Sequence, residues 1–229
     1  MQLVIVHGAG GSGLSFTYQT RHFPSADAVD LPGHPKGKPC PDVEAYTEWV
    51  RGYIWGRGYQ DVVLMGHSMG GAIAITYALR YPEELRGLIL SGTGARLRVH
   101  PQTLADLEAA VGNPGPWLEQ RAQGWAHLPE ALRHQLMERA KATGPAVQLH
   151  DMRCCDRFDR MEAVSDIRVP TLVLVGSEDV MTPVKYAEYL AKHIPGTRRL
   201  VVVPGGTHGV YHEKPEEVNA AIQEFLASL

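Results

Sequence analysis

The chain has 229 residues, of which 44% are hydrophobic and 21% charged, and its formal net charge is −3. That length suits one sizeable domain, or a core domain that carries an insertion. Because the charge is nearly balanced and no apolar run is as long as a bilayer is thick, neither a nucleic-acid partner nor a membrane partner is expected.

The first predicted strand covers Leu3 to Val6 and leads into the glycine-rich segment His7–Gly13. No basic region precedes this strand, so we interpret it as buried structure and not as a signal peptide. The glycine-rich segment lacks the Gly-Lys-Ser/Thr of a phosphate-binding loop and the acidic residue of a dinucleotide site. We therefore predict an oxyanion loop in which the backbone N–H of Ala9 is the donor and Gly10 its neighbour.

A short strand is then predicted from Ala26 to Leu31, and it leaves through a turn in which His34 is expected to be solvated. Apolar residues at helical spacing follow from Asp42 and stop at Gly56–Gly58. The next segment, Asp61 to Met65, has the composition of a core strand.

That strand ends in the sequence Gly66-His67-Ser68-Met69-Gly70 and passes directly into the apolar helical segment Ala72–Leu79. In a sharp turn between a strand and a helix the middle residue is strained, and glycines are needed where a Cβ would strike the crossing backbone. Such a turn lifts the Ser68 hydroxyl above the sheet, close to a helix N-terminus that favours developing negative charge. Ser68 is therefore a candidate nucleophile that requires partners elsewhere.

After a further strand from Leu85 to Leu90, the composition changes over residues 96–166. This stretch has helical patterns interrupted by prolines and no convincing strand, so we predict a helical cap inserted into a core made of residues 1–95 and 167–229. Some apolar cap residues should line a substrate cleft beneath it. The predicted substrate-binding residues are Gly10, Trp117, Trp125 and Leu128.

Strands and helices alternate again after the cap, with strands at Thr171–Val175 and Leu200–Val203 and helices at Pro183–Ile194 and Pro215–Leu229. Strands interleaved with helices predict a doubly wound parallel sheet of the α/β class, covered on both faces.

A serine nucleophile needs a general base that is itself oriented by a third group. In a parallel sheet these partners should follow the carboxyl ends of later strands, which is where Asp179 and His208 occur. The chain order Ser68, Asp179, His208 is the order expected for a nucleophile elbow of this kind. The residue pattern leaves Glu178, Asp156 and Asp159 open as alternative acids and His212 as an alternative base.

Together these segments resemble the α/β-hydrolase superfamily, in particular its small esterase-like and lipase-like branch, over essentially the whole chain. The resemblance rests on His7-Gly8, Asp30-Leu31-Pro32-Gly33-His34, Gly66–Gly71, Gly176-x-x-Asp179, and Gly-x-His208 followed by Glu213-x-Pro215. It implies that Ser68 attacks a carbonyl carbon, that His208 accepts the proton and that Asp179 orients the imidazole. It also implies an oxyanion hole formed by the N–H groups of Ala9 and Met69.

The chain departs from the family pattern in two places. Members usually open with an antiparallel strand pair, whereas here the first strand begins at Met1, so we expect about six strands, all parallel. An exposed sheet edge favours pairing with another subunit, and we expect a monomer or a homodimer. In addition, Pro35-Lys36-Gly37-Lys38 follows His34 where the family usually has Gly-x-Ser.

Cys40, Cys154 and Cys155 form no disulfide framework and no metal-ligand spacing, and we interpret the adjacent pair as free thiols within a helix. The eleven histidines are dispersed, so no metal and no cofactor are expected. A reduced, cytoplasmic protein is the default expectation.

The expected function is a carboxylesterase-like serine hydrolase (EC 3.1.1 type) that cleaves small-molecule esters of short to medium acyl length through an acyl-enzyme on Ser68. Three activities on the same triad remain as rivals: a thioesterase, a carbon–carbon bond hydrolase and a perhydrolase. A non-catalytic small-molecule receptor on a hydrolase scaffold is the rival from another class.

Overall fold

Six strands form one sheet in the order β2-β1-β3-β4-β5-β6 in the computed structural model, which describes residues 1–229, and every neighbouring pair is parallel. This confirms the predicted six-stranded parallel sheet. The strand order reverses between β1 and β3, and ligands of open α/β sheets bind at the carboxyl ends of the strands at such a point. The strands are β1 (Gln2–Val6), β2 (Ala26–Val29), β3 (Val62–His67), β4 (Leu85–Ser91), β5 (Thr171–Gly176) and β6 (Thr197–Val203).

The central strands are buried on both faces and the edge strands are not. Every residue of β3 and β5 is buried, which explains their unbroken apolar sequences. The edge strand β2 has only four residues, and the other edge strand, β6, exposes Arg198 and Arg199. A short strand and a charged strand are two ways in which proteins keep sheet edges from pairing with other chains.

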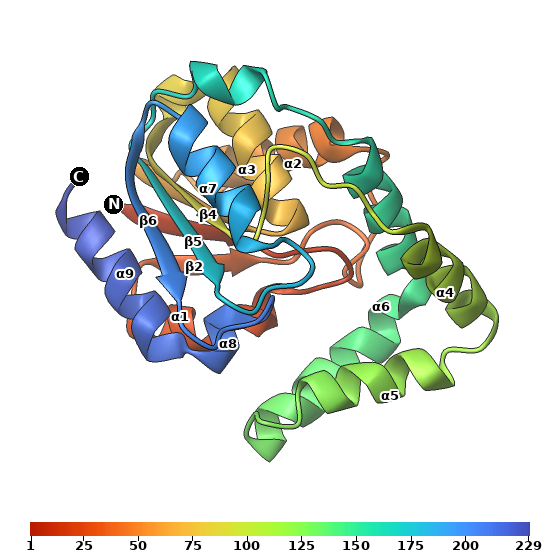
Figure 1. The fold of residues 1–229 in the computed structure, drawn as a ribbon. Helices are drawn as coiled ribbons and strands as arrows, with labels where there is room; N and C mark the ends of the chain where they lie inside the picture. Colours follow the sequence, from red (N-terminus) through yellow and green to blue (C-terminus); the bar gives the residue numbers. More distant parts are fainter.

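Helices cover both faces of the sheet (Figure 1). Helices α2, α3 and α7 pack on one face through residues such as Tyr46, Ile73 and Leu190, while α1, α8 and α9 pack on the other through Val210 and Phe225. The short helices α1 and α8 carry too little periodicity to predict. None of the helices is both long and apolar enough to cross a membrane. The helices of the core are α1 (Thr17–His22), α2 (Val43–Gly56), α3 (Met69–Arg80), α7 (Val184–His193), α8 (Val210–Glu213) and α9 (Pro215–Ala227), with short 3-10 turns at Gly13–Phe16, Pro82–Glu84 and Ala163–Asp166.

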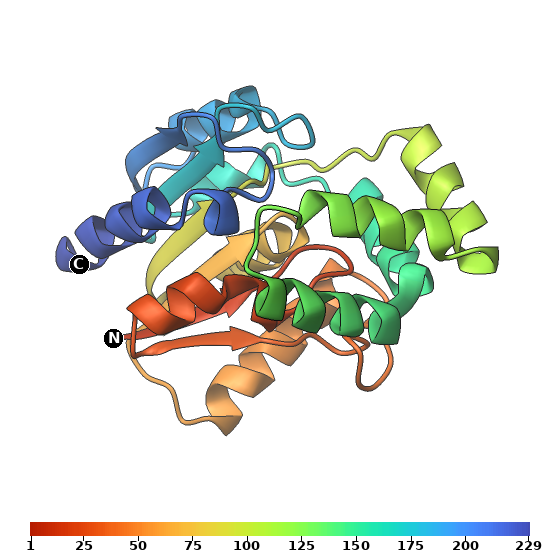
Figure 2. The same cartoon turned by 90° about the horizontal axis from the view of Figure 1, so that it is seen from below.

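Three further helices lie between β4 and β5 in the chain and form the predicted helical cap beside the sheet (Figures 1 and 2). They are α4 (Pro101–Gly112), α5 (Gly115–Gly124) and α6 (Glu130–Arg157). Prolines mark these helices because the ring suits a first turn but interrupts a helix interior. Pro101 opens α4, and α6 is broken at Gly144, whose φ is 77°, directly before Pro145. The cap boundaries at residues 96 and 166 stay a prediction.

One expectation about the loop after β2 is wrong. His34 is not solvated but has no exposed surface at all. The reason is that the loop from Asp30 folds inward beneath α6, where Asp151 contacts the imidazole.

Candidate active site

Ser68 alone forms the turn between β3 and α3, because β3 ends at His67 and α3 begins at Met69. Its φ and ψ are 54° and −118°, a conformation that costs a side-chain-bearing residue free energy of order 1–3 kcal/mol. Two hydrogen bonds hold the turn: the Ser68 N–H donates to Ser91 O at 3.1 Å, and Thr93 Oγ1 donates to Ser68 O at 2.8 Å. The predicted strand–turn–helix is therefore present.

The two glycines of the turn are required by close backbone contacts. A Cβ added to Gly66 would lie 2.1 Å from Gly70 O, and one added to Gly70 would lie 2.2 Å from Val6 O. Both contacts are with backbone oxygens, which cannot rotate out of the way as the end of a flexible side chain can. Any larger residue at these two positions would therefore displace the turn that carries Ser68.

Asp179 follows β5 and His208 follows β6, and their side chains meet where the strands end. His208 Nδ1 lies 2.9 Å from Asp179 Oδ2. Thr182 Oγ1 donates to the same oxygen at 2.8 Å, while Asp179 Oδ1 accepts from the N–H groups of Met181 and Thr182. Burial alone would raise the pKa of Asp179, but the hydrogen bonds from His208 and Thr182 outweigh it and hold the pKa below its usual value.

The alternative acids and the alternative base make other contacts. Asp156 accepts the Val99 N–H, Asp159 accepts the Met161 N–H, and Glu178 is exposed. His212 is buried and its Nδ1 lies 3.1 Å from His127 Nε2. Of the residues that the sequence left open, only Asp179 and His208 pair with each other.

His67 packs against the loop that carries His208. Its Nε2 donates to the His208 carbonyl oxygen at 2.9 Å, and the two ring centroids are 4.6 Å apart. Burial lowers the pKa of His67 well below its usual value, so the ring is a neutral donor. This agrees with the sequence interpretation of His67 as a loop-packing residue.

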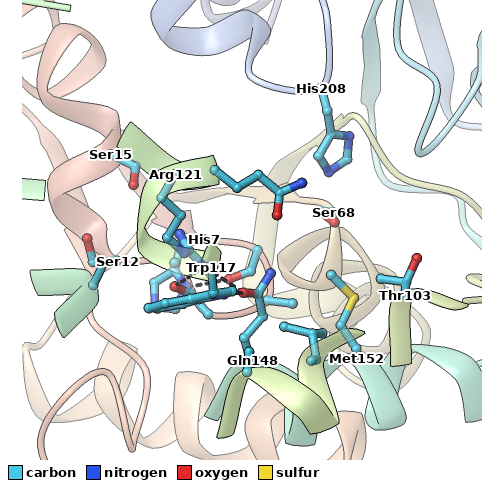
Figure 3. A pocket seen from close by; sticks show the side chains of 18 of the residues that line it. His7, Ser12, Ser15, Ser68, Thr103, Trp117, Arg121, Gln148, Met152 and His208 are labelled. Carbon is cyan, nitrogen blue, oxygen red and sulfur yellow. Dashed lines mark hydrogen bonds between the residues drawn. The ribbon is translucent and has the colours of Figure 1, made fainter. Parts of the chain in front are cut away.

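Ser68 and His208 line the same pocket, and the imidazole extends toward the Ser68 hydroxyl (Figure 3). No hydrogen bond joins the two side chains: the side-chain partners of His208 are Asp179 and Thr182. In enzymes without substrate this contact is often long and shortens only when the substrate binds. In this structure His208 is therefore hydrogen-bonded to Asp179, and the Ser68 hydroxyl beside it is not yet bonded to His208.

The predicted oxyanion donors lie on two segments beside Ser68. A Cβ added to Gly8 would lie 2.9 Å from Ser68 Cβ, so the loop that carries Ala9 passes directly next to the serine. The Ala9 N–H has no hydrogen-bond acceptor in the protein, and the Met69 N–H is in the first turn of α3, where helices leave such groups free. Both groups remain available to an anion at Ser68.

The pocket has a volume of about 840 Å³ and lies between the carboxyl ends of β1 and β3 and the three cap helices. Three of the four predicted substrate-binding residues, Gly10, Trp117 and Trp125, line it. Figure 3 shows Trp117 in the pocket wall. Leu128 lies at the turn between α5 and α6 and does not line the pocket.

A buried polar cluster beneath the pocket was not predicted from the sequence. Asp151 of α6 accepts the Gly10 N–H at 2.9 Å, His34 Nε2 at 2.8 Å and the Tyr46 hydroxyl at 2.9 Å, and all four residues are buried. His34 Nδ1 lies 3.0 Å from the Pro32 carbonyl oxygen, so both ring nitrogens face oxygen atoms of the protein. The cluster therefore ties the cap to the oxyanion loop.

The whole chain matches known proteins. A family model described as the alpha/beta hydrolase family covers residues 3–221. A pimeloyl-acyl-carrier-protein methyl ester esterase of Neisseria meningitidis serogroup C is 28% identical over 98% of this chain and 93% of its own length. The solved structure of a thermophilic esterase is 33% identical, with a TM-score of 0.80, over 99% of this chain and 90% of that one. A thermophilic esterase from Thermogutta terrifontis, solved with malate bound, is 25% identical with a TM-score of 0.83, over 100% and 90% of the two chains.

Proposed function

Because the chain belongs to the α/β-hydrolase family and is an ester-hydrolysing enzyme, we propose that it cleaves carboxylic esters of short to medium acyl length through an acyl-enzyme on Ser68. One observation carries this proposal. The strained Ser68 opens into the same pocket as His208, whose other ring nitrogen is held by the buried Asp179.

The proposed reaction has two halves. Ser68 Oγ attacks the ester carbonyl carbon while His208 Nε2 takes the hydroxyl proton, and Asp179 stabilises the imidazolium that results. The oxyanion accepts hydrogen bonds from the N–H groups of Ala9 and Met69, each worth roughly 3 to 4 kcal/mol in the transition state. Collapse of this intermediate breaks the ester C–O bond and passes the proton to the departing alcohol. Water, deprotonated by the same imidazole, then releases the acid and restores the free Ser68 hydroxyl.

The apolar lining of the pocket supports the proposal that the acyl chain of the substrate lies under the cap. Its apolar side chains come from all three cap helices and form a small buried cluster there. These pocket-lining residues are Leu107, Ala110, Trp117, Ala140 and Met152. The curated relative from Neisseria is named for a methyl ester, and we extend a small leaving alcohol to this chain as part of the proposal.

A substrate panel tests the proposal. Methyl and p-nitrophenyl esters of graded acyl length should be hydrolysed with an optimum at short to medium length, whereas the matching acyl-CoA thioesters should react more slowly. Ser68→Ala should abolish turnover with an unchanged circular dichroism spectrum. Activity confined to thioesters would contradict the carboxylesterase assignment, and hydrolysis of neither esters nor thioesters would favour a receptor. The cytoplasmic location and the monomeric or homodimeric state stay predictions.

A further inference from the structure

Arg121 of α5 lines the pocket without a carboxylate partner. Its guanidinium lies over two indole rings, 4.5 Å from the centroid of Trp117 and 5.6 Å from that of Trp125. Burial lowers the pKa of Arg121 to about 10, which leaves the side chain charged at neutral pH. Tyr211 acts on this pKa in the opposite direction and raises it. A largely desolvated cation therefore stands in the pocket wall.

The hydrogen bonds of Arg121 use only part of its donor set. Nη2 donates to Gln148 Oε1 at 2.9 Å and to Gly10 O at 3.3 Å. Trp117 Nε1 donates to the same amide oxygen at 2.6 Å, so Gln148 is already shared. Nε has no access to solvent and no partner. A guanidinium offers five N–H donors in a rigid fork, so most of them are not used by the protein.

Other charged groups in the pocket do not neutralise Arg121. The remaining arginine there, Arg139, is paired with Asp30, which is not part of the pocket lining. The only acidic side chain in the lining, Asp106 of α4, is exposed and accepts a hydrogen bond from Gln102. Buried charges in proteins are normally paired, because removing an unpaired charge from water is costly. This makes Arg121 different from the paired Arg139.

We propose that Arg121 binds an anionic oxygen group of the substrate, a carboxylate or a phosphate ester, while the ester carbonyl lies at Ser68. The position of the guanidinium determines how far the anionic group of the substrate lies from the ester carbonyl. It contacts the carbonyl of Gly10, the residue directly after the oxyanion donor Ala9, and consecutive Cα atoms are about 3.8 Å apart. Figure 3 shows Arg121, Trp117 and Gln148 together on one side of the pocket, with Ser68 and His208 on the other. The anion and the ester are therefore joined by a short chain, as in the monoester of a dicarboxylic acid.

This inference rests on the proposed esterase function and adds a substrate class to it. The competing explanation is structural: Arg121 serves only to hold the Gly10 loop in place. The two explanations differ in one respect. A structural role affects neutral and anionic esters alike, whereas an anion site affects only the anionic ones.

The experiment compares monomethyl and dimethyl esters of succinate, glutarate, adipate and pimelate. In the wild type, kcat/KM should favour the monoester for at least one chain length. Arg121→Met, which keeps the side-chain stem and removes the charge, should reduce that preference roughly 10- to 100-fold, and Arg121→Lys should restore part of it. Arg139→Met, the matched pocket arginine that is already paired, should change both substrates by the same factor. A preference that survives Arg121→Met overturns the proposal.

A binding measurement keeps the inference separate from catalysis. With the Ser68→Ala protein, titration calorimetry should detect monomethyl glutarate, and the added Arg121→Met change should weaken that binding at least tenfold. Inhibition of neutral-ester hydrolysis by glutarate supports a carboxylate substrate, and stronger inhibition by inorganic phosphate supports a phosphate ester. Binding in Ser68→Ala without turnover in the wild type would contradict the esterase function alone. No binding of either anion, with turnover of neutral esters intact, would contradict the Arg121 site alone.

Discussion

Two aspartate–histidine pairs lie on either side of the oxyanion loop, at nearly equal distances and in very different surroundings. His208 Nδ1 is 2.9 Å from Asp179 and His34 Nε2 is 2.8 Å from Asp151. The His208 side chain is 19% exposed, and its Nε2 faces the pocket, whereas the His34 side chain has no exposed surface. One pair leaves a ring nitrogen for chemistry, and the other uses both nitrogens to bind protein.

The comparison shows that an aspartate–histidine contact does not by itself identify a general base. The buried pair joins α6, α2, the loop after β2 and the N–H of Gly10, one residue beyond Ala9. Its role is to fix the position of the cap and the oxyanion loop. The pocket pair has instead a free nitrogen and a serine to act on. Replacing each pair separately should therefore change different properties.

The largest effect is expected for His208→Ala. Without the base, kcat/KM for esters should fall roughly 10⁴-fold or more, while the free energy of unfolding changes little because the ring is partly exposed. Ester hydrolysis and urea unfolding measure the two quantities. His34→Ala is the matched control, and it should lower stability more than rate. A His208→Ala enzyme with near-normal turnover would show that the pocket pair is not catalytic.

Asp151→Ala should destabilise the protein by about 3–5 kcal/mol, because it leaves the buried His34 ring, the Tyr46 hydroxyl and the Gly10 N–H without their partner. Equilibrium urea unfolding measures this loss. In a double-mutant cycle with His34→Ala, the two changes should be strongly non-additive. Additive effects would mean that the buried pair does not act as a unit.

His7, which packs against the buried pair, should make the free energy of unfolding depend on pH. Its ring centroid lies 4.7 Å from that of His34, and burial, followed by the charge on His34, lowers the pKa of His7 to about 4. The unfolded chain binds a proton at His7 below about pH 6.5, whereas the folded protein does so only near pH 4. The contribution of His7 to the free energy of unfolding is therefore complete above pH 6.5 and is lost as the pH falls toward 4. The loss from this residue is about 3 kcal/mol. In urea unfolding between pH 7.5 and 4.5, the free energy of unfolding of His7→Asn should depend less on pH than that of the wild type. An equal slope in the two proteins would contradict this role of His7.

The smallest effect is expected for Thr182→Val. The change removes the hydroxyl that donates to Asp179 Oδ2 at 2.8 Å, a bond to a charged group worth about 1.5 kcal/mol. Values of kcat/KM should fall roughly tenfold, because the orientation of Asp179 toward His208 is weakened. Thr182→Ser keeps the hydroxyl and should be close to the wild type. Equal losses in both variants would assign Thr182 a packing role only.

The sequence predicts the pocket pair and not the buried pair, for a physical reason. Ser68 and Asp179 each follow a fully buried apolar strand, and His208 follows the apolar end of the edge strand β6. Parallel strands bring the loops at their carboxyl ends to one edge of the sheet. Asp151 lies inside a helix with no motif around it, and its partners come from segments more than 100 residues away. No spacing rule connects such residues, so His34 was expected in solvent.

The cap was predictable as helices but not as a surface. Its prolines and helical spacing indicated α4 to α6, yet which side chains face the pocket depends on the break at Gly144 and on how α5 lies against the β1 loop. Trp117 and Trp125 line the pocket, Leu128 does not, and Arg121 was not anticipated. The only signal for Arg121 in the sequence is an arginine spaced four residues from each tryptophan, a pattern that also suits an exposed helix.

The most direct test of the account is covalent labelling of Ser68 by a fluorophosphonate, followed by intact-protein mass spectrometry. The wild type should gain one adduct, mapped to Ser68 by peptide analysis, His34→Ala should still react, and His208→Ala should react far more slowly. Ser68→Ala should gain none. An adduct of equal yield on the Ser68→Ala protein, or none on the wild type, would contradict the assignment of Ser68 as the nucleophile.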